Sequence, residues 1–189
     1  MKVSTRMARR ACAIAAAAIA ALLIPAVALA APGRASRPAD SAPRCLESQL
    51  RTWIGLPGDG TAGSVYYQLE ISNISAQPCT LLGYPGVSAV GDNGQQLGSP
   101  AVRDSSHPAR LITLGRDATA HVILGIVDAW NYPKATCAQV SATGLRVFAP
   151  NDFRSQTIPL TFEACQKAGP KFLHVSVALA GTGIPGYSY

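Results

Sequence analysis

Apolar and polar residues alternate with a period of two along much of the chain after residue 45. The clearest case is Ser64–Ser72, whose same-side apolar positions are Val65, Tyr67, Leu69 and Ile71. Such alternation is typical of a strand with one face on the core and the other in water. Ala118–Val127 alternates in the same way, with Ala120, Val122, Leu124 and Ile126 on one side. The pattern therefore predicts a protein built mainly from β-strands.

Shorter apolar runs, bounded by Gly, Pro, Asn or Asp, predict further strands at Val87–Val90, Gln95–Leu97, Leu111–Leu114, Leu145–Phe148, Ile158–Phe162 and Phe172–Leu179. Asn93-Gly94 predicts a hairpin turn, because both positions tolerate a positive φ. No long helical period is present, and only Ala135–Val140 or Phe162–Lys167 could form a turn of helix. Many short strands with regular breaks predict an immunoglobulin-like β-sandwich of about seven to nine strands. The Cys…Trp…Cys spacing of true immunoglobulin domains is missing, so this prediction concerns architecture alone.

The first 30 residues have the three parts of a secretory signal peptide. Four basic residues precede the apolar run Ala11–Leu23, and Ala28-Leu29-Ala30 fits the small-residue cleavage rule. A membrane anchor is the alternative, but Pro25 breaks the run well short of the roughly 20 apolar residues that a spanning helix needs. We expect cleavage after Ala30 and no stable transmembrane segment in the mature protein; Arg9-Arg10 alone is weak support for a twin-arginine signal.

Removing the signal peptide changes the charge of the chain. The chain has 16 basic and 10 acidic residues, and four of the basic residues but none of the acidic ones lie in residues 1–30. The remainder is therefore nearly balanced, and it has no basic stripe of the kind that nucleic-acid binding requires. Residues 31–44 are rich in Pro, Ala and Ser and predict a disordered spacer, followed by a single domain over residues 45–189.

Four cysteines remain after the signal peptide: Cys45, Cys79, Cys137 and Cys165. An even number in an exported chain predicts disulfides. Of the three possible connectivities we favour Cys45–Cys79 with Cys137–Cys165, which keeps the two closed loops separate. A four-cysteine zinc site is the alternative, but these cysteines include no close C-x-x-C pair.

One stretch is more specific than the rest. Gly63–Ser75 runs into Pro78–Val87, and the second part contains Cys79 and the sequence Gly83-Tyr84-Pro85-Gly86. Physically, the two glycines and the proline predict a sharp turn before a new strand, with Tyr84 packed over the corner. Asn73-Ile74-Ser75 formally matches a glycosylation sequon, but a turn is the better interpretation.

This stretch resembles the core pattern of an actinobacterial exported family known as domain of unknown function 4232. The resemblance covers most of residues 45–180, including Cys45, Cys137 and Cys165. It implies export or envelope attachment, two disulfides and a β-sandwich, and it brings no activity, substrate or catalytic residue. Many members look like lipoproteins, and this chain departs from that pattern because no cysteine directly follows Ala30.

Candidates for catalysis are few. His107 and Asp104 share a polar loop and could serve a hydrolase or a metal site, but triad members usually come from distant segments. His121 and His174 could form a metal-binding pair if their strands were neighbours, although surface positions are the simpler interpretation. The chain has no nucleophile elbow, phosphate loop or dinucleotide fingerprint, so we expect no cofactor and no enzymatic activity.

Aromatic residues in loops are the remaining candidates for function. Trp130, Asn131 and Tyr132 form a polar, turn-rich segment of the kind that carries binding on rigid scaffolds. Alternatively, Trp130 folds back as a lid over the core. Trp53, Tyr187 and Tyr189 are weaker candidates. We expect a non-enzymatic binding module with an envelope or extracellular partner; a hydrolase or metal-binding protein using His107 and Asp104, and a structural envelope protein, are the alternatives.

Overall fold

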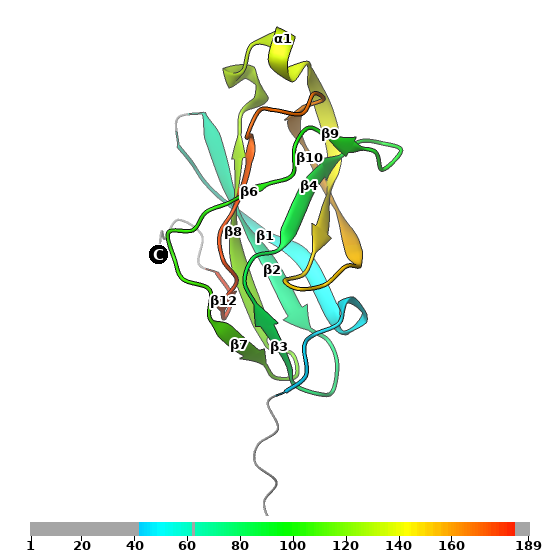
Figure 1. The fold of residues 1–189 in the computed structure, drawn as a ribbon, viewed down its shortest axis with the longest axis vertical. Helices are drawn as coiled ribbons and strands as arrows, with labels where there is room; N and C mark the ends of the chain where they lie inside the picture. The colour runs from blue at the N-terminus through cyan, green and yellow to red at the C-terminus, as the bar shows by residue number, and fades with distance from the viewer. Residues whose placement is uncertain (1–41, 62, 184–189) are drawn as a thin grey trace, which may run out of the picture. The chain divides into compact units, whose positions relative to one another are not determined.

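The strands form two larger sheets and one small sheet in the computed structural model, which describes residues 42–61 and 63–183 (Figure 1). The first sheet has the order β1-β2-β8-β11-β6, with β12 also paired to β8. Its strands are β1 (Leu50–Thr61), β2 (Ser64–Asn73), β6 (Val102–Arg103), β8 (Thr119–Val127), β11 (Leu173–Val175) and β12 (Leu179–Ala180). The second sheet has the order β10-β9-β4-β5. Its strands are β4 (Gly86–Val90), β5 (Gln96–Leu97), β9 (Gln139–Phe148) and β10 (Ser155–Cys165).

Short elements complete the fold at its two ends. The two-stranded sheet consists of β3 (Cys79–Leu82) and β7 (Leu111–Leu114). The helical elements are single turns: η1 (Glu47–Gln49), η2 (Ala129–Asn131) and α1 (Lys134–Cys137). The turn of helix expected near residue 135 is therefore present, whereas the other candidate, Phe162–Lys167, overlaps the end of β10.

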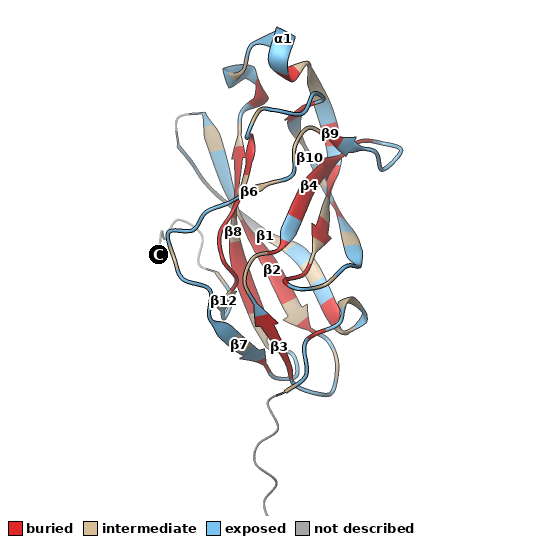
Figure 2. Cartoon of the chain, viewed as in Figure 1, coloured by how far each residue is buried: buried red, intermediate tan, exposed pale blue. Residues whose placement is uncertain are grey.

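The two larger sheets share one apolar core, as expected for a β-sandwich. Leu69 and Leu124 from the first sheet and Leu145 and Val147 from the second are almost fully buried in the same cluster. Figure 2 shows buried stretches along β8 and β4, one strand from each sheet. The facing sides of both sheets thus remove their alternating apolar residues from water, which is the main stabilising contribution in a protein of this kind. The predicted all-β class is confirmed.

The side chain of Gln156 joins the two sheets where their edge strands meet. The Gln156 Oε1 atom accepts a hydrogen bond from the backbone N–H of Thr52 at 2.8 Å, and its Nε2 donates to the carbonyl of Leu50 at 2.6 Å. One amide on β10 therefore satisfies backbone groups of β1 that face away from the first sheet's ladder, which reduces the exposed edge of that sheet.

Both predicted disulfides are present, Cys45–Cys79 and Cys137–Cys165. All four cysteines are fully buried. The first links the start of the domain to β3, beside backbone hydrogen bonds from Cys45 N to Thr80 O and from Thr80 N to Pro43 O. Pro43 belongs to the predicted spacer, so the end of that segment is ordered, contrary to the expectation; the predicted signal peptide and residues 31–41 of the spacer lie outside the described residues.

The strands differ from the expectation in number, since the described residues form 12 rather than about seven to nine. The long strand β1 was missed because its second half contains Gly55, Pro57, Gly58 and Gly60, which resemble a loop. It is nevertheless a strand because it pairs along the whole of β2, with irregularities at Pro57 and Gly60. The single strand expected over Phe172–Leu179 is divided into β11 and β12.

The predicted turns are present with one change of detail. Gly94 has a φ of 70° in the β4–β5 connection, but Asn93 has an ordinary negative φ, so this is not the expected two-residue turn with two positive φ values. Gly83 has a φ of 98°, and its carbonyl accepts a hydrogen bond from the N–H of Ala178 at 2.9 Å. The glycine thus turns the chain before β4 and connects it to the last strands.

Asn73 organises the turn after β2 from inside the protein. Its side chain is 0% exposed. The Nδ2 atom donates to the carbonyls of Gln77 at 2.8 Å and Leu114 at 3.0 Å, and Oδ1 accepts from the N–H of Ser75 at 2.9 Å. A buried amide with these partners cannot carry a glycan, so the turn interpretation of the sequon is confirmed.

The outer face of β2 is not in water, contrary to the expectation from its alternating pattern. Gln68 and Glu70, on the predicted polar face, are 6% and 2% exposed. His121, expected on the surface, is 4% exposed. The cause is the chain that follows β12: Gly183 N donates to Glu70 Oε1 at 3.1 Å, and the carbonyl of Gly181 lies 2.8 Å from His121 Nδ1. The end of the described chain therefore covers polar residues that the pattern assigned to solvent.

Candidate functional site

Trp130 lies outside the core, on the loop between β8 and α1. Its side chain is 68% exposed, whereas the preceding Ala129 is fully buried. The alternative in which Trp130 closes over the core is therefore wrong. Asp128 begins the short helix η2, because its carboxylate accepts a hydrogen bond from the N–H of Trp130 at 3.0 Å. An aspartate in this position satisfies a backbone donor that the turn leaves free.

Asn131 fixes this loop to the β1–β2 turn. Its Nδ2 donates to the carbonyl of Gly63 at 3.0 Å, and the N–H of Asp128 donates to the same carbonyl at 2.8 Å. Gly63 has a φ of 82°, and a Cβ atom there would lie 2.5 Å from Asn131 Nδ2. Only glycine combines this backbone conformation with so close a neighbour.

Gln139 and Tyr132 hold the loop from the other side. Gln139 Nε2 donates to the carbonyls of Ala129 at 3.0 Å and Tyr132 at 2.8 Å. The Tyr132 hydroxyl donates to the carbonyl of Lys171 at 3.1 Å. The disulfide Cys137–Cys165 joins α1 to the end of β10, and Cys137 lies two residues before Gln139 in the chain. The loop is therefore fixed at both ends, while Trp130 projects from it.

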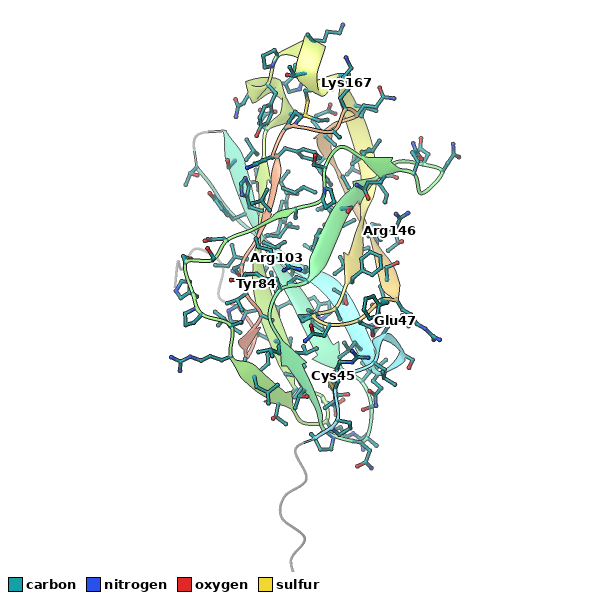
Figure 3. The ribbon with its side chains drawn as sticks, in the orientation of Figure 1. Cys45, Glu47, Tyr84, Arg103, Arg146 and Lys167 are labelled. Atoms are coloured by element: carbon teal, nitrogen blue, oxygen red, sulfur yellow. A yellow bond between two sulfur atoms is a disulfide. The ribbon has the colours of Figure 1, made fainter. Side chains whose placement is uncertain are left out.

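An open depression lies beside this loop, at the end of the fold that carries α1. It has a volume of about 510 Å³ and lies between Tyr132, Ala135 and Thr136 on one side and residues 167–170 on the other. Lys167 spans it, since its Nζ donates to the carbonyl of Ala135 at 2.8 Å, and Figure 3 shows this side chain at the α1 end. The depression is mostly apolar, and Lys167 places a positive charge across it, so it suits a ligand that combines apolar contact with negative charge.

Asp104, Ser106 and His107 lie together in one loop, but their hydrogen bonds do not have the order of a catalytic triad. The Asp104 carboxylate accepts a hydrogen bond from the N–H of Ser106 at 3.0 Å, and Ser106 Oγ lies 3.1 Å from His107 Nδ1. The hydrogen bonds from Ser106 hold the pKa of Asp104 below its usual value. Asp104 is exposed, and among the described hydrogen bonds none joins it to His107. The carboxylate thus supports the turn and does not orient the imidazole, as a triad requires.

Tyr84 lies at the corner before β4, as expected, and it holds the loop that contains His107. Its hydroxyl donates to the carbonyl of His107 at 3.4 Å. The Arg103 guanidinium lies 5.6 Å from the centre of the Tyr84 ring, and Figure 3 shows the two side chains together. This cation–π contact connects the turn before β4 with β6 and stabilises the corner.

His121 and His174 do not meet. His174 pairs with Gly125 across the β11–β8 ladder. His121 lies four residues before Gly125 on β8, which places it about 13 Å from that pair at the usual rise per residue. His174 Nε2 lies 2.9 Å from the carbonyl of Lys171. Among the residues that the structure describes, no group of three or more His, Cys, Asp or Glu side chains is placed to hold a metal ion.

Glu70 is the titratable group that the sequence did not single out. Burial beneath the last described residues raises its pKa, and the hydrogen bond from the N–H of Gly183 partly offsets that effect. The alternation along β2 gave no signal for this burial, because the covering segment lies more than 100 residues further along the chain. Trp53, the other aromatic candidate, donates from its ring nitrogen to Ser72 Oγ at 3.0 Å and is 39% exposed. Tyr187 and Tyr189 lie outside the described residues.

Comparison with known proteins gives a family but no activity. Over residues 42–61 and 63–183, no helix is long and apolar enough to cross a membrane. A search of curated proteins found no match. The family model described as "Domain of unknown function (DUF4232)" matches residues 45–178, which include both disulfides and every element from η1 to β11. The chain therefore belongs to the family of domain of unknown function 4232.

Proposed function

We propose that the chain is an exported, non-enzymatic binding module whose binding surface is the Trp130 loop together with the depression beside it. The observation that carries this proposal is a tryptophan that is 68% exposed on a loop fixed by hydrogen bonds at both ends. Leaving so large an aromatic side chain in water forgoes the stabilisation that its burial would provide. A partner that covers the indole recovers it.

The rigidity of the loop strengthens this argument. Binding by a mobile loop must first order its backbone and side chains, which weakens the complex. Here Asn131, Gln139 and the Asp128 cap already fix the backbone around Trp130. The indole is therefore presented before a partner arrives, as at binding hot spots, where a central aromatic residue contributes much of the affinity.

The site of action follows from the cysteines. Two disulfides with fully buried sulfur atoms favour an oxidising compartment outside the cytoplasm. Together with the signal-peptide pattern of residues 1–30, they support a protein that is secreted or held at the cell envelope. A fully oxidised domain offers no thiol for covalent catalysis, which supports the non-enzymatic assignment.

The test compares two exposed aromatic residues. Trp130→Ala should lose the envelope components that the oxidised wild-type protein retains in a pull-down, and the same components should disappear from cross-linking in intact cells. Phe153→Ala is the matched control, because Phe153 is 89% exposed in the β9–β10 turn, at the far end of those strands from Cys137 and Cys165. Equal retention by both variants would remove the Trp130 loop as the binding surface, provided that both keep the wild-type melting temperature.

A structural role in the envelope makes a different prediction. A structural protein would stay on intact cells after extensive washing, and its retention would not depend on one side chain. Retention that survives washing in Trp130→Ala as well as in wild type would therefore favour the structural alternative over a specific binding module.

A further inference from the structure

We propose that the ligand of this surface is an acidic polysaccharide, a chain of sugar rings that carries carboxylate groups; this inference rests on the proposed function above. It names the chemistry of the partner from the charges and ring surfaces that meet at one end of the fold.

The first observation is the distribution of lysines. The chain has four lysines, of which Lys2 lies in the signal-peptide region. The other three, Lys134, Lys167 and Lys171, are all exposed at the α1 end. Lys167 lines the depression, Lys134 precedes its lining residue Ala135, and Lys171 follows its lining residue Pro170. Three lysines from two separate segments therefore lie at this end of the fold, one of them lining the depression and two next in sequence to residues that line it.

The second observation is that the rest of the described domain is nearly neutral. Outside residues 128–137 and 165–171, the described chain carries seven arginines and eight acidic residues. Inside those ranges Asp128 is the one acidic residue among those described, and its carboxylate already accepts the N–H of Trp130. The excess of positive over negative charge is thus found at the end that carries the exposed tryptophan, and a negatively charged partner is attracted to this end rather than to the whole surface.

The third observation is the combination of flat rings with an open, shallow surface. The indole of Trp130 offers a broad electron-rich face, against which the C–H-rich face of a sugar ring stacks favourably. The depression between α1 and residues 167–170 lies open to solvent, so a polymer can cross it without an end having to enter a closed pocket. Lysine ammonium groups on flexible stems reach carboxylates at variable spacing, which suits a polymer better than one fixed anion.

Polypeptides and nucleic acids fit these observations less well. An acidic peptide would satisfy the lysines but gives no reason for an exposed indole at the same end of the fold. A nucleic acid would use both features, but three lysines make a small footprint compared with the long basic stripe typical of such proteins. A carboxylated sugar chain uses the charge and the ring surface together.

The experiment measures binding of the oxidised full-length mature protein to three polymers by titration calorimetry. Polygalacturonate carries both rings and charge, its fully methyl-esterified form keeps the rings without the charge, and poly-glutamate keeps the charge without the rings. We expect the tightest binding to polygalacturonate, with an affinity that falls as salt rises. Equal affinity for the esterified polymer would refute the role of charge, and equal affinity for poly-glutamate would refute the role of the sugar.

Two sets of variants assign the effect to this end of the fold. Lys134→Glu with Lys171→Glu should weaken polygalacturonate binding by roughly tenfold or more at low salt, by analogy with the loss of phosphate contacts in polyanion binding. This pair leaves the hydrogen bond of Lys167 intact, so the fold is not at risk. The matched control is Arg110→Glu with Arg116→Glu, since both arginines are exposed and lie outside the site. It makes the same change in net charge and should alter the affinity for polygalacturonate less than twofold.

The outcomes separate the ligand from the function. If the lysine pair and the arginine pair weaken binding equally, or if polygalacturonate does not bind, the acidic polysaccharide is refuted. The binding module itself still stands in that case if Trp130→Ala loses the envelope components in the pull-down. If Trp130→Ala changes neither assay, both proposals fail.

Discussion

Replacing Asn73 with alanine tests most directly how a buried polar side chain organises this fold. Alanine removes the Nδ2 donor to the carbonyls of Gln77 and Leu114 and the Oδ1 acceptor of the Ser75 N–H. It also removes the acceptor of the Ser75 hydroxyl, which lies 2.7 Å from Asn73 Oδ1. The side chain is 0% exposed, so water does not reach its position directly.

The expected loss follows from these contacts. Each hydrogen bond contributes about 1 kcal/mol net, and a buried group left without a partner costs about 1–3 kcal/mol more. Gln77 is exposed, so its carbonyl regains a partner in water, whereas the carbonyl of Leu114 belongs to a residue that is almost fully buried. We therefore expect Asn73→Ala to lower the free energy of unfolding by about 3 kcal/mol. That is a large part of the roughly 5–15 kcal/mol typical of a domain.

Urea denaturation of the oxidised protein measures this loss. At a typical slope of about 2 kcal/mol per molar urea, the midpoint should fall by about 1.5 M. Ser75→Ala is the control, because it removes the hydroxyl contacts but leaves the buried amide in place, and it should cost about 1 kcal/mol or less. A midpoint for Asn73→Ala within about 0.3 M of wild type, or equal to that of Ser75→Ala, would refute the reasoning.

Asn73→Asp sharpens the same test with pH. The new carboxylate would face the carbonyl oxygens that Nδ2 now binds, so burial and repulsion would raise its pKa. The folded state would then hold a proton that the unfolded state releases, and stability would fall as pH rises. The difference in unfolding free energy between wild type and this variant should therefore widen from pH 4 to pH 7, and a constant difference would contradict the assigned orientation of the amide.

Three further predictions concern Glu70, Asp152 and the second disulfide. The raised pKa of Glu70 means that wild-type stability falls as pH rises through it, so the stability gained by Glu70→Gln, measured by thermal melts, should increase between about pH 4.5 and pH 7. Burial raises the pKa of Asp152, but the N–H groups of three residues outweigh that effect and lower it overall. Asp152→Asn should therefore cost about 1–2 kcal/mol at pH 7, and the gap in urea midpoint should close as pH falls below 3.8. Removing Cys137–Cys165 by double alanine substitution should cost about 3.6 kcal/mol, because the bond closes a loop of 28 residues.

Each of these has a result that would contradict it. A pH-independent effect of Glu70→Gln would mean that the carboxylate is solvated in the folded protein. For Asp152, a gap that persists unchanged at pH 3 would exclude the carboxylate as the acceptor that matters. For Cys137 and Cys165, unchanged stability in the double variant would show that contacts around α1 fix this end without the disulfide.

Elements whose structure depends on a local apolar pattern could be predicted from the sequence, whereas those that depend on a distant partner could not. Strands such as Ser64–Asn73 and Thr119–Val127 bury one apolar side, so their pattern is visible locally. Leu50–Thr61 contains turn-forming residues and is a strand only because β2 offers it a partner along its length. Glu70 and His121 belong to an outward-facing row, and their burial depends on residues 181–183, which no local pattern connects with them. The composition of the Trp130 loop identified it as a candidate. Its fixed geometry could not be predicted, because it depends on contacts with Gly63 and Gln139.

The sequence by itself determined the strand-rich class, the disulfide-compatible cysteine count, the family and the segment with the best aromatic candidate, since these depend on residue type and spacing along the chain. Only the tertiary structure decided which polar residues are buried, that Trp130 projects into solvent, and that the segments carrying three lysines meet at one depression, which Lys167 lines. The physical reason is the sequence separation of the residues involved. Periodicity along one strand identifies the side that avoids water. The residues that cover its other side, and the charges at one end of the fold, are far apart in sequence and meet only when the sheets pack.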